Sequence, residues 1–439
     1  MQSLKAALNI KTGEMISFIG GGGKTTAMFL LAKELSQKKQ VLVTTTTKIE
    51  YLAQYVTVVA ESIEEALVKM EGMDSAIIVL GRKIEGNKLH GLPKSWLNKL
   101  KEHFDYILIE ADGAAHKALK GYAHYEPVIP GGSSMVVALV GMSVEGKALD
   151  NANVHRAALL SQTIGVSNNT IIVPWMIARV CEEMAKLTSE QAPDARKVVF
   201  LNQVEPANHG QYLRLAGCLV EEYYDSAIIG RLLPTIKVKK IDKGITVPVV
   251  AIVLAAGMSA RMGNENKLML PWRNTTIIRQ VVETTVKVFG NDLLVVGGHQ
   301  YRHLTDHLSD LTNRIIYNED YRCGQSTSVK KGLAKVNNSY IGAMFLLGDQ
   351  PLIQTEILES LLTAFKINQA SAVYPTYNNK RGNPTIFHRT LFSRLMQIEG
   401  DRGGRLILEE KKADVLAVPV NTNTVLKDID TKEDWQQLR

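Results

Sequence analysis

Two glycine-rich loops, each directly after an apolar run, constrain this chain more than any other feature of its sequence. The loop Gly20–Thr26 (GGGGKTT) follows Ile16–Ile19, and the loop Ala255–Gly263 (AAGMSARMG) follows Val249–Leu254. A strand, a glycine loop and a basic residue, in that order, give a backbone shape that can hold a polyphosphate. Because the loops lie more than 200 residues apart, the sequence predicts two nucleotide-using domains in one polypeptide.

The composition is that of an ordinary globular protein, with 45% hydrophobic and 22% charged residues among 439. The net charge of +7 is modest, and no run of Lys and Arg with interleaved aromatics indicates a nucleic-acid surface. Three cysteines lie far apart, which argues against disulfides or a zinc site. Met1–Lys11 lacks the apolar core of a signal peptide, and no apolar run approaches the ~20 residues of a membrane helix. We therefore expect a cytoplasmic protein that contacts neither membrane nor nucleic acid.

Short apolar runs alternate with helical stretches along most of the chain, a pattern typical of parallel strands buried on both faces. The expected strands are Met15–Ile19, Val41–Thr44, Ile77–Leu80, Tyr106–Ile109, Met135–Val140, Lys197–Leu201, Val249–Leu254, Leu293–Val296, Arg314–Tyr317, Ala343–Leu347 and Ala372–Pro375. The expected helices include Thr25–Ser36, Thr276–Val288, Thr327–Lys335 and Gln354–Phe365. The lysine-rich stretch at 237–247 is interpreted as a solvated linker between domains at residues 1–240 and 247–439.

The first loop has the residues that a phosphate site needs. The glycines Gly21, Gly22 and Gly23 allow backbone N–H groups to turn toward phosphate oxygens. Lys24 is expected to reach the β- and γ-phosphates of ATP or GTP, the Thr25 hydroxyl to bind Mg²⁺, and Thr26 to lie beside the nucleotide. The alternative is a glycine-rich turn that starts a helix.

The first loop also departs from the full phosphate-loop pattern. Phe18 stands where G-x-x-x-x-G-K-[ST] has its first glycine, and Ile19 stands where a deviant form of the loop has a second lysine. We therefore expect nucleotide binding there with slow hydrolysis.

Polar residues follow three further apolar runs of the N-terminal half. Asp112 comes after Tyr106–Ile109 and is the expected acid on the Mg²⁺ side of the nucleotide, or else a cap of the next element. Asn202 and Glu205 come after Lys197–Leu201 and resemble a degenerate base-recognition N-K-x-D. The threonines of Thr44–Lys48 are either strand-end residues or a contact to the γ-phosphate.

The N-terminal half resembles the selenium-dependent hydroxylase accessory (YqeC-like) family over roughly residues 5–235. The resemblance is carried by GGGGKTT, the threonine run before Lys48, EADGA at 110–114, EPVIP at 126–130 and NVHR at 153–156. It implies a connection with the maturation of a molybdenum hydroxylase, and thus an apo-hydroxylase as a partner.

The second loop is followed by a basic residue and two carboxylates. Arg261 and Lys267 are expected to be catalytic by neutralising charge on the α-phosphate and the leaving pyrophosphate. Asp349, also expected to be catalytic, follows the run Ala343–Leu347, where an open α/β sheet places a metal ligand. Asp430 supplies a second carboxylate for Mg²⁺, or else caps the last helix.

The C-terminal half resembles the molybdenum cofactor cytidylyltransferase (MocA-like) family over about residues 247–439. The resemblance rests on LAAGxSxRMG, GDQP at 348–351, GNPTIF at 382–387 and GDRGGR at 400–405. It implies transfer of CMP from CTP to molybdopterin with release of pyrophosphate. Residue by residue, it implies CTP contacts at Leu254, Ala255, Ala256, Gly257, Arg261 and Lys267, Mg²⁺ at Asp349 and Asp430, and acceptor contacts at Gly324, Gln325, Ser326, Gly382 and Pro384. For Gly324–Ser326 the alternative is an ordinary helix N-terminus.

Together these features predict an α/β fold with two domains. The first is a P-loop NTPase-like domain, and the second is a Rossmann-like nucleotidyltransferase domain with a mixed, mostly parallel sheet. The alternative functions are transfer from GTP, transfer to another phosphorylated acceptor, and a nucleotide-switched carrier that hands cofactor to an apo-hydroxylase.

Overall fold

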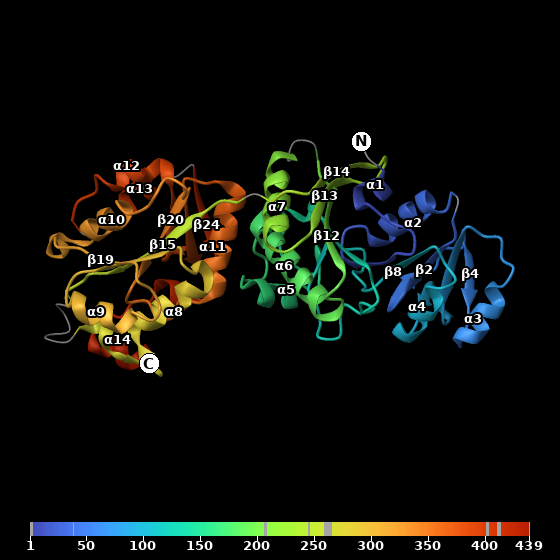
Figure 1. Cartoon of the computed structure of the whole chain (residues 1–439), viewed down its shortest axis with the longest axis horizontal. Helices are drawn as coiled ribbons and strands as arrows, with labels where there is room; N and C mark the ends of the chain where they lie inside the picture. Colours follow the sequence, from blue (N-terminus) through green and yellow to red (C-terminus); the bar gives the residue numbers. More distant parts are fainter. Residues whose placement is uncertain are drawn as a thin grey trace. The chain divides into compact units, whose positions relative to one another are not determined.

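The computed structural model describes residues 3–37, 39–205, 209–244, 246–258, 266–400, 404–410 and 414–438. The chain divides into two compact units, which are described one at a time (Figure 1). The N-terminal unit comprises Met1–Ile164 and Asn168–Thr246, and the C-terminal unit comprises Val247–Arg439 with Gly165–Ser167. No helix in the described ranges is long and apolar enough to span a membrane.

A single large sheet forms the centre of the N-terminal unit. Its order from edge to edge is β14-β13-β12-β10-β1-β8-β2-β5-β4, and every neighbouring pair except β13–β14 is parallel. The strands are β1 (Met15–Gly20), β2 (Val41–Thr45), β4 (Val56–Val59), β5 (Ile77–Gly81), β8 (Tyr106–Glu110), β10 (Met135–Gly141), β12 (Arg196–Asn202), β13 (Ser226–Arg231) and β14 (Lys237–Ile241). Because β1 lies near the middle, the glycine loop that follows it sits at the centre of the sheet's carboxyl edge.

Helices cover both faces of this sheet, because successive strand residues point to opposite sides. Ile16 and Phe18 of β1 pack in one core with α1 (Leu4–Leu8) and α2 (Lys24–Leu35). Met15 packs in a second core with α3 (Ile63–Met70) and α4 (Lys94–Leu100). Figure 1 shows α6 (Pro174–Gln191) and α7 (His209–Glu222) beside β12 and β13.

Three smaller elements of the N-terminal unit matter for the site. A three-stranded sheet pairs β3 (Lys48–Glu50), β7 (Lys88–His90) and β6 (Ile84–Glu85). A two-stranded sheet pairs β9 (Leu119–Lys120) with β11 (Val154–His155), and α5 (Ala157–Ile164) follows it.

The C-terminal unit is built on a second, mixed sheet. Its order is β19-β18-β15-β20-β23-β21-β22, with β24 paired to β21. The first four strands are parallel to one another, whereas β23 runs antiparallel to both its neighbours. The strands are β15 (Val249–Ala255), β18 (Leu293–Gly297), β19 (Ile315–Tyr317), β20 (Gly342–Leu347), β21 (Ala372–Tyr377), β22 (Lys380–Arg381), β23 (Thr385–His388) and β24 (Val415–Pro419).

Helices flank this sheet as well (Figure 1). The helices α8 (Ile277–Phe289) and α11 (Thr355–Asn368) pack on each other and on β15 and β21. Another core joins the sheet to α10 (Gln325–Leu333), α12 (Phe392–Leu395) and α13 (Arg405–Glu410). The unit also contains α9 (Tyr301–Leu308), α14 (Lys432–Leu438) and the short pair β16 (Pro271–Trp272) and β17 (Thr275–Thr276). The expected α/β class with mixed, mostly parallel sheets is confirmed.

The predicted linker is wrong in its first half. Lys237–Ile241 forms β14, the antiparallel edge strand of the N-terminal sheet. Val238 is buried while Lys237 and Lys239 point to solvent. Lysines are common on edge strands because they discourage pairing with another chain, and that composition is easily mistaken for a linker.

Candidate functional site

A cavity of about 590 Å³ opens at the carboxyl ends of β15 and β20 in the C-terminal unit. The loop Leu254–Met258 forms one wall. The other lining residues come from four further segments of the chain: Lys267 and Leu268; Tyr321, Arg322, Gly324, Gln325 and Ser328; Leu347 and Asp349; and Asp428 and Asp430. The cavity therefore brings together most of the residues that the sequence assigns to nucleotide, metal and acceptor.

A lysine lies between two carboxylates at this cavity. Lys267 Nζ donates to Asp349 Oδ2 at 2.6 Å and to Asp430 Oδ1 at 2.9 Å. Asp349 follows β20, and its carbonyl accepts from the Ile429 amide at 3.0 Å, which ties the two acidic segments together. The other oxygen of Asp349, Oδ1, is buried with no hydrogen-bond partner among the described residues. Two carboxylates that converge on one cation, with one oxygen still free to bind, fit a divalent metal.

The charges at this cavity perturb one another. Burial opposes the charge of Lys267, but Asp349 and Asp430 outweigh it and raise the pKa of the ammonium. Burial, with Asp349 and Asp430 nearby, raises the pKa of Asp428, a third carboxyl at the cavity wall. The site therefore has an excess of negative charge that a cation relieves.

Of the remaining predicted C-terminal residues, some line this cavity and others do not. Arg261 lies outside the described residues. Gly324 and Gln325 line the cavity at the start of α10, whereas Ser326 is buried and is not among its lining residues. Gly382 is not among them either: a Cβ there would meet the Val425 carbonyl at 2.5 Å, so its backbone packs against the segment before Asp428. Pro384 lines a separate, small cavity beside α8.

The glycine loop of the N-terminal unit is fixed by close backbone contacts. Gly22 has φ +77°, and a Cβ there would meet the Gly141 amide nitrogen at 2.2 Å, so only glycine fits. The amides of Gly20, Gly21 and Gly22 donate to Asp112 Oδ2, the Leu139 carbonyl and the Lys117 carbonyl. The expected cradle of successive glycine amides is therefore wrong for Gly21 and Gly22, whose amides already have backbone partners. A phosphate would instead meet Gly23 and the start of α2, which has no side-chain cap.

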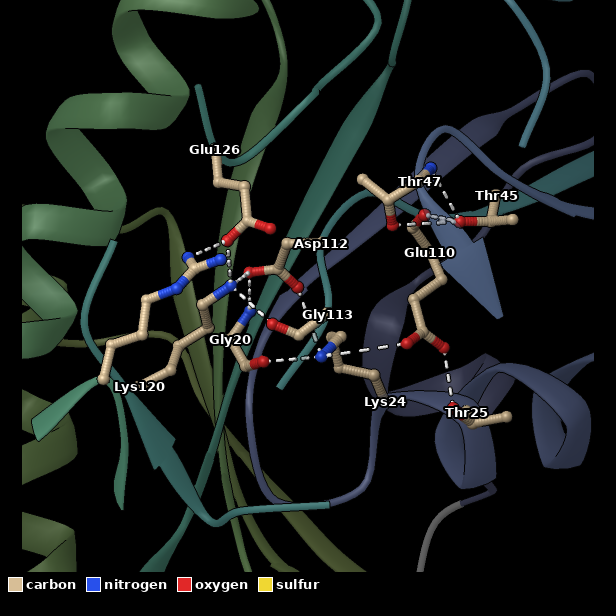
Figure 2. Close-up of polar contacts among 11 residues, drawn as sticks. Gly20, Lys24, Thr25, Thr45, Thr47, Glu110, Asp112, Gly113, Lys120 and Glu126 are labelled. Carbon is tan, nitrogen blue, oxygen red and sulfur yellow. Dashed lines mark hydrogen bonds and ion pairs between the residues drawn. The ribbon is translucent and has the colours of Figure 1, made fainter. Parts of the chain in front are cut away.

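Lys24 is held inside the fold by the loop and two acids (Figure 2). Its Nζ donates to the Gly20 carbonyl at 2.6 Å and lies 3.2 Å from Asp112 Oδ1 and 3.9 Å from Glu110 Oε1. The side chain is only 4% exposed. The Thr25 hydroxyl donates to Glu110 Oε2 at 2.7 Å.

The acid beside Thr25 is Glu110, whereas the sequence led us to expect Asp112 in this place. Glu110 is the last residue of β8 and lines the cavity over the loop. Asp112 lies beyond the strand end, is fully buried, and is not among the residues that line the cavities beside the loop. Burial raises the pKa of Glu110, and Asp112 adds to the rise, while Lys24 and the Thr25 hydroxyl oppose it.

Charges of alternating sign continue away from Lys24 through the interior (Figure 2). Asp112 lies 3.3 Å from Lys120 Nζ, which donates to Glu126 at 2.7 Å, and Glu126 also accepts from Arg156 at 2.6 Å. Lys120 is 1% exposed. The network joins EADGA, EPVIP and NVHR, three motifs whose mutual contacts the sequence did not indicate.

Two cavities flank this loop. The larger, about 540 Å³, is lined by Lys24, Thr25 and Glu110 together with β3, β7 and residues 113–117. The smaller, about 330 Å³, is lined by Asn202, Glu205 and residues 231–234. Gly23, Thr26 and Gln203 line both cavities.

The threonines after β2 have structural partners. Thr44, Thr45 and Thr46 donate their hydroxyls to the carbonyls of Leu80, Glu110 and Val128, respectively. This supports the strand-end interpretation of these residues.

Within the described ranges, no group of three or more His, Cys, Asp or Glu side chains is arranged to hold a metal.

Comparison with known proteins assigns a family to each unit. A YqeC protein family model matches residues 16–158, and a MobA-like NTP transferase domain model matches residues 251–415. The YqeC protein of Escherichia coli K12 is 32% identical over 198 residues, which cover 44% of this chain and 77% of that protein. The chain belongs to the YqeC family.

The C-terminal unit is similar to a different group of proteins. The molybdenum cofactor cytidylyltransferase of E. coli K12 is 27% identical over 185 residues, covering 42% of this chain and 92% of that protein. The nicotine blue oxidoreductase of Paenarthrobacter nicotinovorans is 25% identical over 196 residues, covering 43% of this chain and 96% of that protein. The C-terminal unit is thus a nucleotidyltransferase domain and a homologue of molybdenum cofactor cytidylyltransferase.

Proposed function

We propose that the C-terminal unit transfers CMP from CTP to molybdopterin, forming molybdopterin cytosine dinucleotide and pyrophosphate. One observation carries the proposal: Lys267, Asp349 and Asp430 converge in the lining of a cavity of about 590 Å³ that Leu254–Met258 also line. This is the combination of base pocket, cation and metal ligands that nucleotidyl transfer requires. The similarity to a molybdenum cofactor cytidylyltransferase over 92% of its length supports the choice of substrates.

The chain's own groups would act mainly through position and charge. The acceptor phosphate attacks the α-phosphorus of CTP in line, and the bond from that phosphorus to the pyrophosphate oxygen breaks. A phosphate nucleophile has no need of a covalent enzyme intermediate, so holding the two substrates in line supplies much of the rate. Lys267, released from the carboxylates, neutralises charge that builds on the leaving pyrophosphate.

Asp349 and Asp430 are the residues that would hold Mg²⁺, together with the substrate phosphates. The unpartnered oxygen of Asp349 and the convergence of both carboxylates on Lys267 support this assignment. When bound, the ion would add to the charge neutralisation of the phosphates.

In this proposal the N-terminal unit binds a purine nucleotide with Mg²⁺ at Gly23–Thr26 and assists maturation of a molybdenum hydroxylase. The start of α2 and Lys24 face the phosphates, while Thr25 and Glu110 lie on the metal side. Asn202 supports a base position on the other side of the loop, because its buried Oδ1 has no hydrogen-bond partner among the described residues.

The direct test is to incubate the full chain with molybdopterin, Mg²⁺ and each nucleoside triphosphate in turn, and to identify products by mass. We expect a CMP adduct and pyrophosphate, with kcat/KM for CTP about 100-fold above that for GTP, because base-edge hydrogen bonds left unpaired are costly. Equal use of the two nucleotides, or preference for GTP, would overturn the cytidylyl assignment. Reaction only with a different phosphorylated acceptor would overturn the choice of molybdopterin.

A further inference from the structure

The two cavities beside the N-terminal loop suit the two ends of a nucleotide bound there. Lys24, Thr25 and Glu110 line the larger cavity and not the smaller one. The terminal phosphate and its metal therefore belong on the side of the larger cavity. The smaller cavity, with Asn202 and Glu205, is left for the base.

The larger cavity extends well beyond the place of a terminal phosphate. Its volume of about 540 Å³ is in the range of pockets that enclose a whole small molecule. From the loop it reaches the small sheet that contains Lys48 and Lys88 and an apolar wall that includes Phe29 and Tyr55, whose rings stack 4.4 Å apart. A nucleotide with its base in the smaller cavity leaves this space for a second ligand.

Positive charge predominates around that space. Five lysines line the larger cavity against two acids, Glu50 and Glu110. The lysines come from four different elements of the fold: Lys24 and Lys33 from α2, Lys48 from β3, Lys88 from β7, and Lys117 from the turn after β8. Lys88 stands opposite Glu50 across the strand pair, Lys48 contacts Glu85 at the surface at 3.4 Å, and Lys117 donates to the Ala152 carbonyl. The excess of cations beyond Lys24 is more than a terminal phosphate needs.

We propose that the larger cavity binds a second ligand, a small anionic molecule, end to end with the terminal phosphate of the nucleotide held at Gly23–Thr26. Lys48 and Lys88 contact its negatively charged group, and the Phe29–Tyr55 wall contacts its apolar part. This inference rests on the proposed nucleotide binding by the N-terminal unit and adds the chemical class of the second ligand.

A nucleotide with one extra phosphate probes this space without knowledge of the natural ligand. The experiment compares adenosine 5′-tetraphosphate with ATP, and guanosine 5′-tetraphosphate with GTP, by calorimetric titration of the full chain with Mg²⁺. Only binding that Lys24→Met abolishes is assigned to the N-terminal loop, since the C-terminal unit also takes a triphosphate. We expect the tetraphosphate to bind about tenfold more tightly, because its fourth phosphate enters a cavity lined by more lysines than acids.

Matched variants test which residues cause the tighter binding of the tetraphosphate. The double variant Lys48→Gln, Lys88→Gln should lose the tenfold advantage while keeping wild-type affinity for the triphosphate. Lys83→Gln is the control, because Lys83 is an exposed lysine close to the same small sheet but is not among the residues that line the cavity. A tetraphosphate that binds no better than the triphosphate, or an advantage that survives the double variant, overturns the inference. Absence of binding by every nucleotide instead refutes the proposed nucleotide site on which the inference rests.

Discussion

The two units place a lysine between two carboxylates in different ways. Lys24 lies in the interior, with Asp112 and Glu110 from one strand end and the Gly20 carbonyl as a third partner. Lys267, whose side chain is 14% exposed, lines a cavity together with Asp349 and Asp430, which come from segments about 80 residues apart and are 18% and 39% exposed.

This difference separates a lysine built into the fold from one that ligands can displace. Removing a buried cation leaves buried acids without compensation, which is costly to stability. Removing a partly exposed cation costs little stability, because water and ions compensate the acids. We therefore expect Lys24 to matter for folding and phosphate binding, and Lys267 to matter mainly for turnover.

The largest effect is expected at Asp349. Asp349→Asn keeps the shape but removes a metal-ligand charge, so turnover of CMP transfer should fall by ~10³-fold with folding intact. Steady-state kinetics with thermal unfolding of the same sample measures both. Asp428→Asn, at the same cavity but not bonded to Lys267, is the control and should stay within about tenfold of wild type. Turnover of Asp349→Asn within tenfold of wild type would show that this carboxylate holds no metal.

The stability of the two lysine variants tests the comparison itself. Lys24→Met should destabilise the N-terminal unit by about 3 kcal/mol, lowering its Tm by about 6–12 °C. Lys267→Met should cost below about 1 kcal/mol, and Mg²⁺ should reverse the loss by taking the place of the ammonium. Calorimetric unfolding of the full chain with and without Mg²⁺ measures both. Equal losses would refute the distinction between a structural and a displaceable lysine.

A smaller effect is expected further along the buried network. Burial opposes ionisation of Glu126, but Lys120 and Arg156 outweigh it and lower the pKa of its carboxyl. A lowered pKa gives stability that is present above the ordinary value near 4.5 and is lost as the pH falls through the folded-state pKa. Glu126→Gln should therefore cost about 2 kcal/mol at pH 7 and progressively less below pH 4.5.

The control for that experiment is Glu64→Gln, since the Glu64 side chain is 74% exposed and lies 3.9 Å from Lys99. It should change stability by less than about 0.5 kcal/mol at every pH. A loss in Glu126→Gln that does not depend on pH would mean that packing, and not charge, explains the role of Glu126.

The smallest change is expected when the units are separated. Because the Lys267 site is made wholly of residues from 247 onward, a fragment of residues 247–439 should fold and transfer CMP within about threefold of the full chain. The measurement is initial rate at equal concentration of folded protein. A fragment that is insoluble or inactive beside an active full chain would refute independent domains.

The sequence predicted the secondary-structure elements more accurately than the contacts of individual side chains. The apolar runs gave the central strands of both sheets because a strand buried on both faces has a continuous apolar signal. The sequence also pointed to Lys267, Asp349 and Asp430: Lys267 follows the second glycine loop, Asp349 follows β20, and Asp430 is a candidate second carboxylate for the metal. The edge strand β14 was missed because three lysines in five residues hide its single buried residue, Val238.

The errors at the N-terminal site have a common physical cause. Glu110 and Asp112 are two acids at one strand end, and only the point where β8 stops decides which of them lies beside Thr25. Likewise, the sequence cannot show that the amides of Gly21 and Gly22 donate to residues more than 90 positions away. The bond from Arg156 to Glu126, 30 positions apart, likewise follows from the tertiary fold and not from local pattern.

One measurement tests the central claim most directly: the rate of pyrophosphate release from CTP and molybdopterin by the full chain and by two matched lysine variants. Under conditions where each variant is folded, Lys24→Met should keep a rate close to that of wild type, whereas Lys267→Met should lose about 100-fold or more. That result would assign nucleotidyl transfer to the displaceable lysine of the C-terminal unit. Loss of the rate in Lys24→Met with retention in Lys267→Met would contradict the account.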